Sequence, residues 1–254
     1  MKRYPFVQRS LRMSLVLPCL FASFASRGQQ TPQRNEETIV LVRHGETEWS
    51  RTGRHTGRTD VPLDPEGEAQ ARLLGPRLAQ WTFAEVLCSP LQRARRTCEL
   101  AGLMAGARPD PDIQEWAYGA YEGRTSDEIR ADRPGWVIWK DGVVGGETLG
   151  DVGSRADSVI ARVRDVAGDV ALFAHGHFLR IMASRWCDLP ARAGEALALS
   201  PAAISVLGYE REDPVIWLWN DMPHAAGRVG APIHFTGARR PSAARQSRSR
   251  LTPP

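Results

Sequence analysis

Short runs of apolar, strand-forming residues recur along the chain. They fall at residues 38–43, 85–88, 169–174, 204–208 and 214–219. Between most of them, apolar residues repeat with the period of an amphipathic α-helix. This alternation predicts an α/β fold of three layers (α/β/α) with a mainly parallel central sheet. We expect one domain over residues 37–221.

Local signals predict where two helices start. Residues 64–66 are Asp-Pro-Glu, which gives an N-cap, a proline at the first helical position and an acid in the first turn. Residues 89–90, Ser-Pro, repeat the cap and the proline. Residues 75–76, Gly-Pro, are expected to kink or break the first of these helices.

Residues 1–36 are predicted to lie outside the domain. Four Lys or Arg side chains precede an apolar stretch from Met13 to Ala25, which ends in a small-x-small pattern typical of signal-peptide cleavage. Pro18 and Cys19 interrupt the stretch, and it is shorter than the roughly 20 residues that span a bilayer. Two interpretations stand, an export signal or a non-structural extension of a cytoplasmic protein. Neither predicts stable membrane insertion.

The formal net charge of +4 hides an uneven distribution. Residues 1–35 carry six Lys or Arg, residues 222–254 carry six Arg, and neither segment holds an acid. Residues 36–221 therefore carry 21 basic and 29 acidic side chains, so the basic ends give no reason to expect a nucleic-acid partner. Residues 222–254 are poor in large apolar side chains and are predicted to form a disordered basic tail.

Cysteine and histidine spacing gives no sign of a metal site. The four cysteines, at 19, 88, 98 and 187, show no CxxC spacing, and the histidines lack i, i+4 spacing. We expect free, mostly buried thiols and neither a metal nor a cofactor.

Three of the expected strands end in residues with notable chemistry. These are segments 43–45 (Arg-His-Gly), 89–93 (Ser-Pro-Leu-Gln-Arg) and 175–177 (His-Gly-His). Backbone N–H groups at the carboxyl end of parallel strands point into the crevice there, which suits an anion. Glu115 lies between the last two segments. The pattern predicts cations and imidazoles around one carboxylate.

A series of short motifs follows one order along the predicted domain. They are Arg43-His44-Gly45-Glu46-Thr47, Thr56-Gly57-Arg58-Thr59-Asp60, Ser89-Pro90-Leu91-x-Arg93-Ala94-x-x-Thr97, Glu115-x-x-Tyr118-Gly119-x-x-Glu122-Gly123, Gly146-Glu147-Thr148 and Ala174-His175-Gly176. An isolated Arg-His-Gly is common, whereas this ordered set resembles the histidine phosphatase superfamily, which has the phosphoglycerate-mutase-like fold. Residues 48–50, 136–142 and 173–177 are similar to its branch of acid phosphatases and sedoheptulose-bisphosphatase-like enzymes.

The resemblance implies a set of catalytic roles. His44 would attack phosphorus in line and form a phosphohistidine, while Glu115 would protonate the leaving oxygen and then deprotonate water. A histidine attacks only when neutral, and Arg43, Arg93 and, if charged, His175 would lower the pKa of that imidazole. The same cations would balance the charge on the phosphoryl oxygens.

The resemblance also implies substrate-binding residues. Gly45 would leave room for a phosphate to approach the backbone. Thr56, Gly57 and Gly176 would supply backbone donors. The full set is Gly45, Thr47, Ser50, Thr56, Gly57, Tyr118 and Gly176.

Several other residues keep two interpretations. His177 is either a structural histidine or part of the site. His55 and Arg58 are expected at the rim, and Glu46 and Glu147 are expected to fix arginine side chains rather than to act in catalysis. Aromatic residues either line the substrate pocket or belong to the core. The residues with these two interpretations are Trp49, Trp116, Trp136 and Trp139.

Departures from the mutase pattern favour hydrolysis. Ser50 stands where these mutases usually carry Asn, Trp116-Ala117 replace an Arg-His pair, and an insertion before the second histidine motif is missing. Fewer cations let a monophosphate escape, whereas a mutase must retain it. We expect a phosphatase acting on a small phosphorylated metabolite: a sugar phosphate, a sugar bisphosphate or a broad range of esters. A phosphoglycerate-mutase-type phosphotransferase and a non-catalytic phospho-ligand-binding protein are the alternatives, and the oligomeric state is left open.

Overall fold

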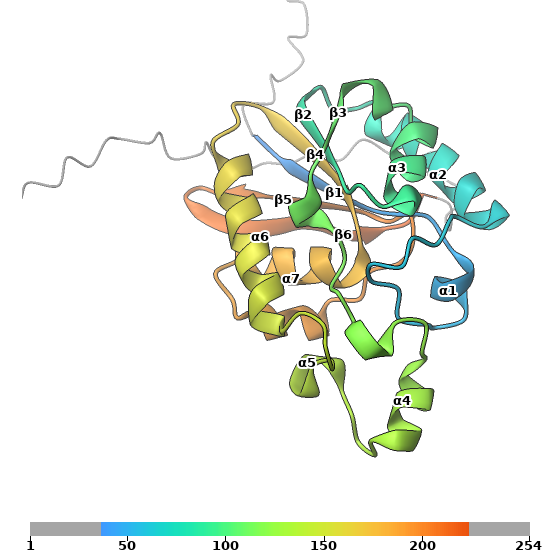
Figure 1. Ribbon diagram of the computed structural model, residues 1–254. Coiled ribbons are helices and arrows are strands. Elements are labelled where there is room, and N and C mark those ends of the chain that lie inside the picture. The colour runs from blue at the N-terminus through green and yellow to red at the C-terminus, as the bar shows by residue number, and fades with distance from the viewer. Residues whose placement is uncertain (1–36, 224–254) are drawn as a thin grey trace, which may run out of the picture. The chain divides into compact units, whose positions relative to one another are not determined.

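The computed structural model describes residues 37–223, so the predictions for residues 1–36 and for the tail beyond residue 223 lie outside it. Within this range a six-stranded sheet has the order β3-β2-β4-β1-β5-β6 (Figure 1). Strands β1 to β4 run parallel, and β5 and β6 add an antiparallel pair beyond β1. The strands are β1 (Ile39–Arg43), β2 (Phe83–Cys88), β3 (Ala107–Pro109), β4 (Asp169–Ala174), β5 (Ile204–Glu210) and β6 (Asp213–Asp221).

Helices cover both faces of the sheet. The α-helices are α1 (Glu48–Arg51), α2 (Pro65–Leu78), α3 (Gln92–Leu100), α4 (Ser126–Asp132), α5 (Ile138–Asp141), α6 (Leu149–Arg164) and α7 (Gly176–Trp186). Short 3₁₀ turns are η1 (Met104–Gly106), η2 (Pro111–Ile113), η3 (Gly119–Tyr121) and η4 (Ala191–Ala196). Helices α2 and α3 pack on one face and α6 and α7 on the other, while α4 and α5 lie beyond the sheet (Figure 1). The predicted three-layer α/β/α class is confirmed.

Strand β1 shows why the layers form. Ile39 and Leu41 join the core beneath α6 and α7, while Val40 and Val42 join the core beneath α2 and α3. Successive side chains of a strand point to opposite faces, so a continuous apolar run fits a sheet covered on both sides. No helix among the described residues is long and apolar enough to cross a membrane.

The local helix signals have mixed outcomes. Helix α2 begins as predicted: Pro65 is its first residue, and Asp64 Oδ1 accepts a hydrogen bond from the Gly67 N–H at 2.8 Å. The helix continues through Pro76 to Leu78, so the predicted break is wrong. Pro76 removes only the one backbone bond that its own N–H would donate, and the burial of Leu78 in the same turn favours continuation of the helix.

Ser89 does not cap a helix. Helix α3 starts three residues later, at Gln92, with Leu91 at the N-cap position and no side-chain cap from it. Asp60 accepts the hydrogen bond of the Gln92 N–H instead, at 2.7 Å. The Ser89 hydroxyl pairs with His175, 86 positions away, which the local pattern could not show.

Candidate active site

The predicted polar segments meet at one edge of the sheet, because β2, β4 and β1 are neighbours that end there (Figure 1). His44 follows β1, and His175 follows β4. Their ring centroids lie 5.2 Å apart. A pocket of about 200 Å³ opens beside them. Its lining residues are Arg43, His44, Ser50, Gly53, Arg54, His55, Thr56, Glu115, Tyr118, Gly176, His177, Arg180 and Leu199.

The pocket includes some of the predicted residues and leaves others behind it. Arg43, His44 and Glu115 line it, whereas Arg93 and His175 are fully buried outside its lining. The predicted binding residues that line it are Ser50, Thr56, Tyr118 and Gly176. Those that do not are Gly45, Thr47 and Gly57. Gly53, Arg54 and Leu199 were not predicted, because loop residues carry no periodic signal.

His44 is held in the form that a nucleophile needs. Its Nδ1 lies 2.7 Å from the Gly45 carbonyl oxygen, and since a carbonyl only accepts, Nδ1 carries the proton. Burial, and then the charges of Arg93 and Arg43, holds the pKa of His44 well below its ordinary value of 6.5. The imidazole is therefore neutral near pH 7. Its Nε2, which no described residue hydrogen-bonds, keeps a lone pair.

His175 is neutral as well. Arg93 Nε donates to its Nδ1 at 3.1 Å, so the ring proton sits on Nε2, which donates to Ser89 Oγ at 2.7 Å. Burial, followed by Arg93 and His44, holds the pKa of His175 well below its ordinary value. Burial, followed by the two arginines and not by a charged His175, therefore keeps the His44 pKa low.

Arg93 is fixed by hydrogen bonds to a loop. Its Nη1 donates to the Thr59 carbonyl at 3.0 Å. Its Nη2 donates to the carbonyls of Thr56 at 3.2 Å and Gly57 at 2.8 Å. Together with the bond to His175, these contacts hold a buried cation in one orientation and leave one N–H of Nη1 without a described acceptor.

Arg43 has an unsatisfied donor. Its Nη1 donates to the Leu199 carbonyl, while its buried Nε has no partner among the described residues. A buried N–H without an acceptor is costly, and an anion in the pocket would satisfy it. Gly176 lets the guanidinium approach, since a Cβ there would lie only 3.3 Å from Arg43 Cζ and Nε.

The Glu115 carboxylate sits against the N-terminus of α7. Its Oε1 accepts the backbone N–H groups of Trp116 and Phe178, both at 2.9 Å. Its Oε2 accepts that of His177 at 3.0 Å. These bonds orient the buried carboxylate. They use the N–H groups of the second and third residues of the helix, and the N–H group of its first residue, Gly176, makes no bond to Glu115.

The expected donor role of Gly57 is wrong. Its N–H donates to Glu122 Oε2 at 3.1 Å, and a Cβ at this position would overlap the Glu122 carboxylate. Gly57 thus makes room for the side chain of Glu122, which belongs to one of the sequence motifs but was assigned no role. Glu122 lies 65 positions away, so no local pattern could reveal the contact.

Gly45, Thr47 and Ser50 have structural contacts. A Cβ at Gly45 would overlap the Gly67 carbonyl in α2, so close helix packing, rather than room for phosphate, explains the glycine. Thr47 caps α1: its Oγ1 accepts the Ser50 N–H at 3.0 Å, and its own N–H donates to Ser50 Oγ at 2.8 Å.

His177 belongs to the pocket wall. Tyr118 Oη lies 2.6 Å from its Nδ1, and both side chains line the pocket. Burial, followed by the charge of Arg180, holds the pKa of His177 well below its ordinary value. His55, expected at the rim, also lines the wall, with its ring centroid 5.0 Å from that of Tyr118.

Glu147 fixes an arginine, as predicted. Its carboxylate accepts Arg155 Nε at 2.7 Å and Arg155 Nη2 at 3.0 Å. Arg155 also donates to the Gln114 carbonyl at 3.0 Å, which anchors the segment that leads into Glu115. The tryptophans at 116, 136 and 139 belong to the core beneath this segment.

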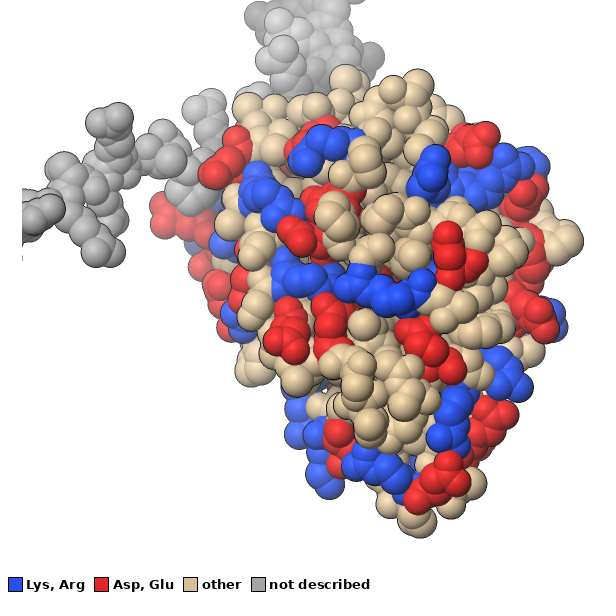
Figure 2. Space-filling view, in the orientation of Figure 1, with Lys and Arg blue, Asp and Glu red and all other residues tan. Residues whose placement is uncertain are grey.

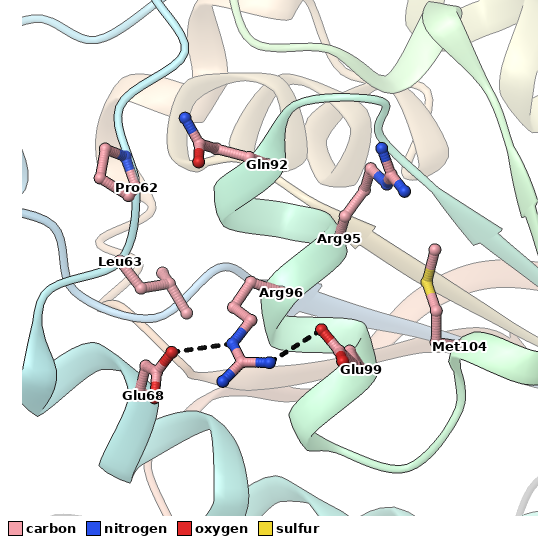
Figure 3. Close-up of a pocket in the computed structure, with 8 residues that line it drawn as sticks. All are labelled: Pro62, Leu63, Glu68, Gln92, Arg95, Arg96, Glu99 and Met104. Carbon is pink, nitrogen blue, oxygen red and sulfur yellow. Dashed lines mark hydrogen bonds and ion pairs between the residues drawn. The ribbon is translucent and has the colours of Figure 1, made fainter.

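Charged side chains are interleaved elsewhere. Figure 2 shows Lys and Arg beside Asp and Glu across one face, without a large area of one sign. A larger cavity, of about 740 Å³, shares no lining residue with the pocket described above. There Arg96 bridges Glu68 of α2 and Glu99 of α3 (Figure 3). Among residues 37–223, no three His, Cys, Asp or Glu side chains are grouped to hold a metal ion.

The fold and the residues at the sheet edge define the class of protein. Residues 39–222 match the histidine phosphatase superfamily (branch 1), and the chain belongs to this family. It is 40% identical over 176 residues to an acid phosphatase from Mycobacterium tuberculosis. The aligned region covers 68% of this chain and 86% of that protein.

Two further comparisons agree. Over 183 residues the chain is 37% identical to sedoheptulose 1,7-bisphosphatase from Saccharomyces cerevisiae. The aligned region covers 59% of this chain and 67% of that protein. A solved structure of an open reading frame product from Mycobacterium tuberculosis superposes with a TM-score of 0.71 at 38% identity, over 74% of this chain and 99% of that one. The predicted phosphoglycerate-mutase-like fold and its family are thereby confirmed.

Proposed function

We propose that this histidine phosphatase, which hydrolyses phosphomonoesters, acts on a small phosphorylated metabolite through a phosphohistidine at His44. The observation that carries the proposal is the state of that imidazole. It is neutral, its proton is held on Nδ1 by the Gly45 carbonyl, and it lines a pocket with an unsatisfied Arg43 donor.

In the first step, Nε2 of His44 attacks phosphorus and the bond from phosphorus to the leaving oxygen breaks. The negative charge on the phosphoryl oxygens falls next to the Arg43 guanidinium in the pocket lining, within reach of the buried Arg93 charge that also acts on His44. Because both cations are already fixed, little reorganisation is needed as the charge develops.

Glu115 supplies the proton in this step. We assign the proton to Oε2, since this oxygen accepts one backbone hydrogen bond whereas Oε1 accepts two. The proton passes to the leaving alkoxide, which departs as the alcohol. Water then attacks the phosphohistidine, the carboxylate takes a proton from it, and inorganic phosphate and free His44 are regenerated.

The pocket favours a small substrate. Its volume of about 200 Å³ suits a phosphoryl group with a compact alcohol, and Arg54 and Arg180 in the wall suit a second anionic group. The named relatives, an acid phosphatase and a sugar bisphosphatase, support sugar phosphates or bisphosphates. Trp116 stands where the mutases usually carry an arginine, and it is buried outside the pocket lining, so it adds no further cation to retain a released monophosphate; this supports hydrolysis over mutase activity.

The test is rapid-quench labelling with a ³²P-phosphomonoester in EDTA. We expect a protein-bound label that is stable in base and labile in acid, present in the wild type and absent from His44→Ala. With an aryl phosphate, whose leaving group needs no acid, Glu115→Gln should accumulate the label, because attack by water still needs a base. A wild type that turns over substrate without any label would refute the phosphohistidine.

Further assays separate the alternatives. A panel of sugar phosphates, sugar bisphosphates, phosphoglycerates and nucleotides should release phosphate. Interconversion of 2- and 3-phosphoglycerate without phosphate release would instead indicate a mutase. Absence of any turnover, together with binding of phosphate, would indicate a non-catalytic phospho-ligand-binding protein.

A further inference from the structure

The carboxylate of Glu122 accepts four backbone hydrogen bonds outside the pocket lining. Its Oε1 accepts the N–H groups of Arg58 at 2.9 Å and Tyr118 at 3.2 Å. Its Oε2 accepts those of Gly57 at 3.1 Å and Thr59 at 3.3 Å. Charge-assisted bonds of this kind are roughly twice as strong as neutral ones. Three of the four donors belong to one loop, residues 57–59.

The same loop contacts Arg93 through its other polar groups. The carbonyls of Thr56, Gly57 and Thr59 accept from the two terminal nitrogens of Arg93, at 2.8 to 3.2 Å. The N–H groups thus bind a carboxylate while the carbonyls bind a guanidinium. This segment belongs to no helix or strand, so regular backbone pairing does not set the direction of its peptide groups.

Arg93 depends on that direction. It is fully buried, so water cannot compensate for a lost acceptor. If the peptide groups turn, the guanidinium loses the carbonyls that hold it. Gly57 fits the same arrangement, because any larger side chain would occupy the place of the Glu122 carboxylate.

We propose that Glu122 is a positioning residue for Arg93: it orients residues 56–59 so that their carbonyls hold the guanidinium beneath the phosphoryl site. The inference rests on the proposed function, in which Arg93 stabilises the phosphoryl charge. It makes a prediction opposite in sign to simple electrostatics. Removing a negative charge near an anion site should tighten anion binding, whereas loss of positioning should weaken it.

The experiment measures competitive inhibition by inorganic phosphate in Glu122→Gln. We expect the inhibition constant to rise about 10-fold or more, because the amide offers one neutral acceptor for four donors. The matched control is Asp151→Asn, which also removes a carboxylate that accepts a backbone hydrogen bond. Asp151 accepts from the Thr148 N–H at 2.8 Å, at the N-terminal cap of α6. The control should change the constant less than about 2-fold.

A double-mutant cycle ties the effect to Arg93. In an Arg93→Ala background, Glu122→Gln should add less than about 2-fold to the inhibition constant, since the group that it positions is gone. Tighter phosphate binding, an unchanged constant with a lowered melting temperature, or equal effects with and without Arg93 would each overturn the proposal.

If Glu122→Gln does not fold, Glu122→Asp serves as the second variant. It keeps the charge but shortens the side chain by one methylene, so it cannot reach all the donors. We expect a smaller rise in the inhibition constant, and a constant equal to that of the wild type would count against positioning. Failure of the function itself would look different, since His44→Ala would then leave wild-type turnover intact.

Discussion

Three neutral imidazoles, those of buried His44 and His175 and of partly buried His177, make the protein sensitive to mild acid. Burial is the largest cause of the lowered pKa in His44, His175 and His177. In the unfolded chain these groups regain their ordinary pKa of 6.5. As the pH falls through that value, the unfolded state binds protons that the folded state does not. The free energy of unfolding therefore falls with pH.

The size of the effect follows from the protonation of the unfolded state alone. An imidazole that stays neutral in the folded protein costs about 1.4 kcal/mol of stability between about pH 7.5 and about pH 5.5. Three such groups cost about 4 kcal/mol, a large part of the roughly 5–15 kcal/mol that holds a domain folded. Carboxyl groups titrate mostly below about pH 5, so this window isolates the histidines.

Urea titrations at the two pH values measure the difference. His177→Asn removes one of the three groups and should reduce the loss by about 1.4 kcal/mol, to about 3 kcal/mol. A free energy of unfolding that is unchanged between the two pH values would refute the assignment of these three imidazoles as neutral in the folded protein. A loss of the same size in His177→Asn would refute it for that residue.

Three further outcomes are expected. The acid limb of kcat/KM against pH should lie below pH 6.5, because the pKa of His44 is lowered; a limb centred at 6.5 would contradict this. Gly45→Ala should lose at least about 2 kcal/mol of unfolding free energy in urea, since a Cβ would overlap the Gly67 carbonyl, and an unchanged midpoint would show that α2 moves freely. Arg155→Met should lower kcat by about 10-fold or more while KM changes little, because the segment that carries Glu115 loses its anchor; equal loss in KM would point to substrate binding instead.

The sequence predicts most of the sheet because strand signals are local. The parallel strands β1 and β4 are buried apolar runs, β2 ends in one, and the ends of β1 and β4 bring His44 and His175 together. Strand β3 was missed, since Ala107–Pro109 is three residues long, lacks a repeating pattern and contains a proline.

What the sequence could not predict depends on loops that meet across long separations. The hydrogen bonds from residues 57–59 to Glu122 span more than 60 positions, and those of Ser89 with His175 span 86. Neither has a local signal, so Gly57 was given the role that the resemblance implied, and Ser89 the capping role that the following proline suggested. Motif resemblance predicted residues that line the pocket, such as Arg43, His44 and Glu115, but it also named Gly45, Thr47 and Gly57, which do not, and it did not show which groups any of them contact.

The two halves of the reaction come from different parts of the chain. His44 and Arg43 lie at the end of β1, and Arg93 lies in the helix that follows β2. Glu115 and Tyr118, which line the pocket, instead lie between β3 and α6, in residues 110–148. We expect that this stretch can be exchanged between relatives as one contiguous graft, provided that Glu115 is kept together with Glu122, which contacts the loop that holds Arg93. A change confined to this one segment of the gene could therefore alter which leaving groups the enzyme prefers, in natural variation or by engineering.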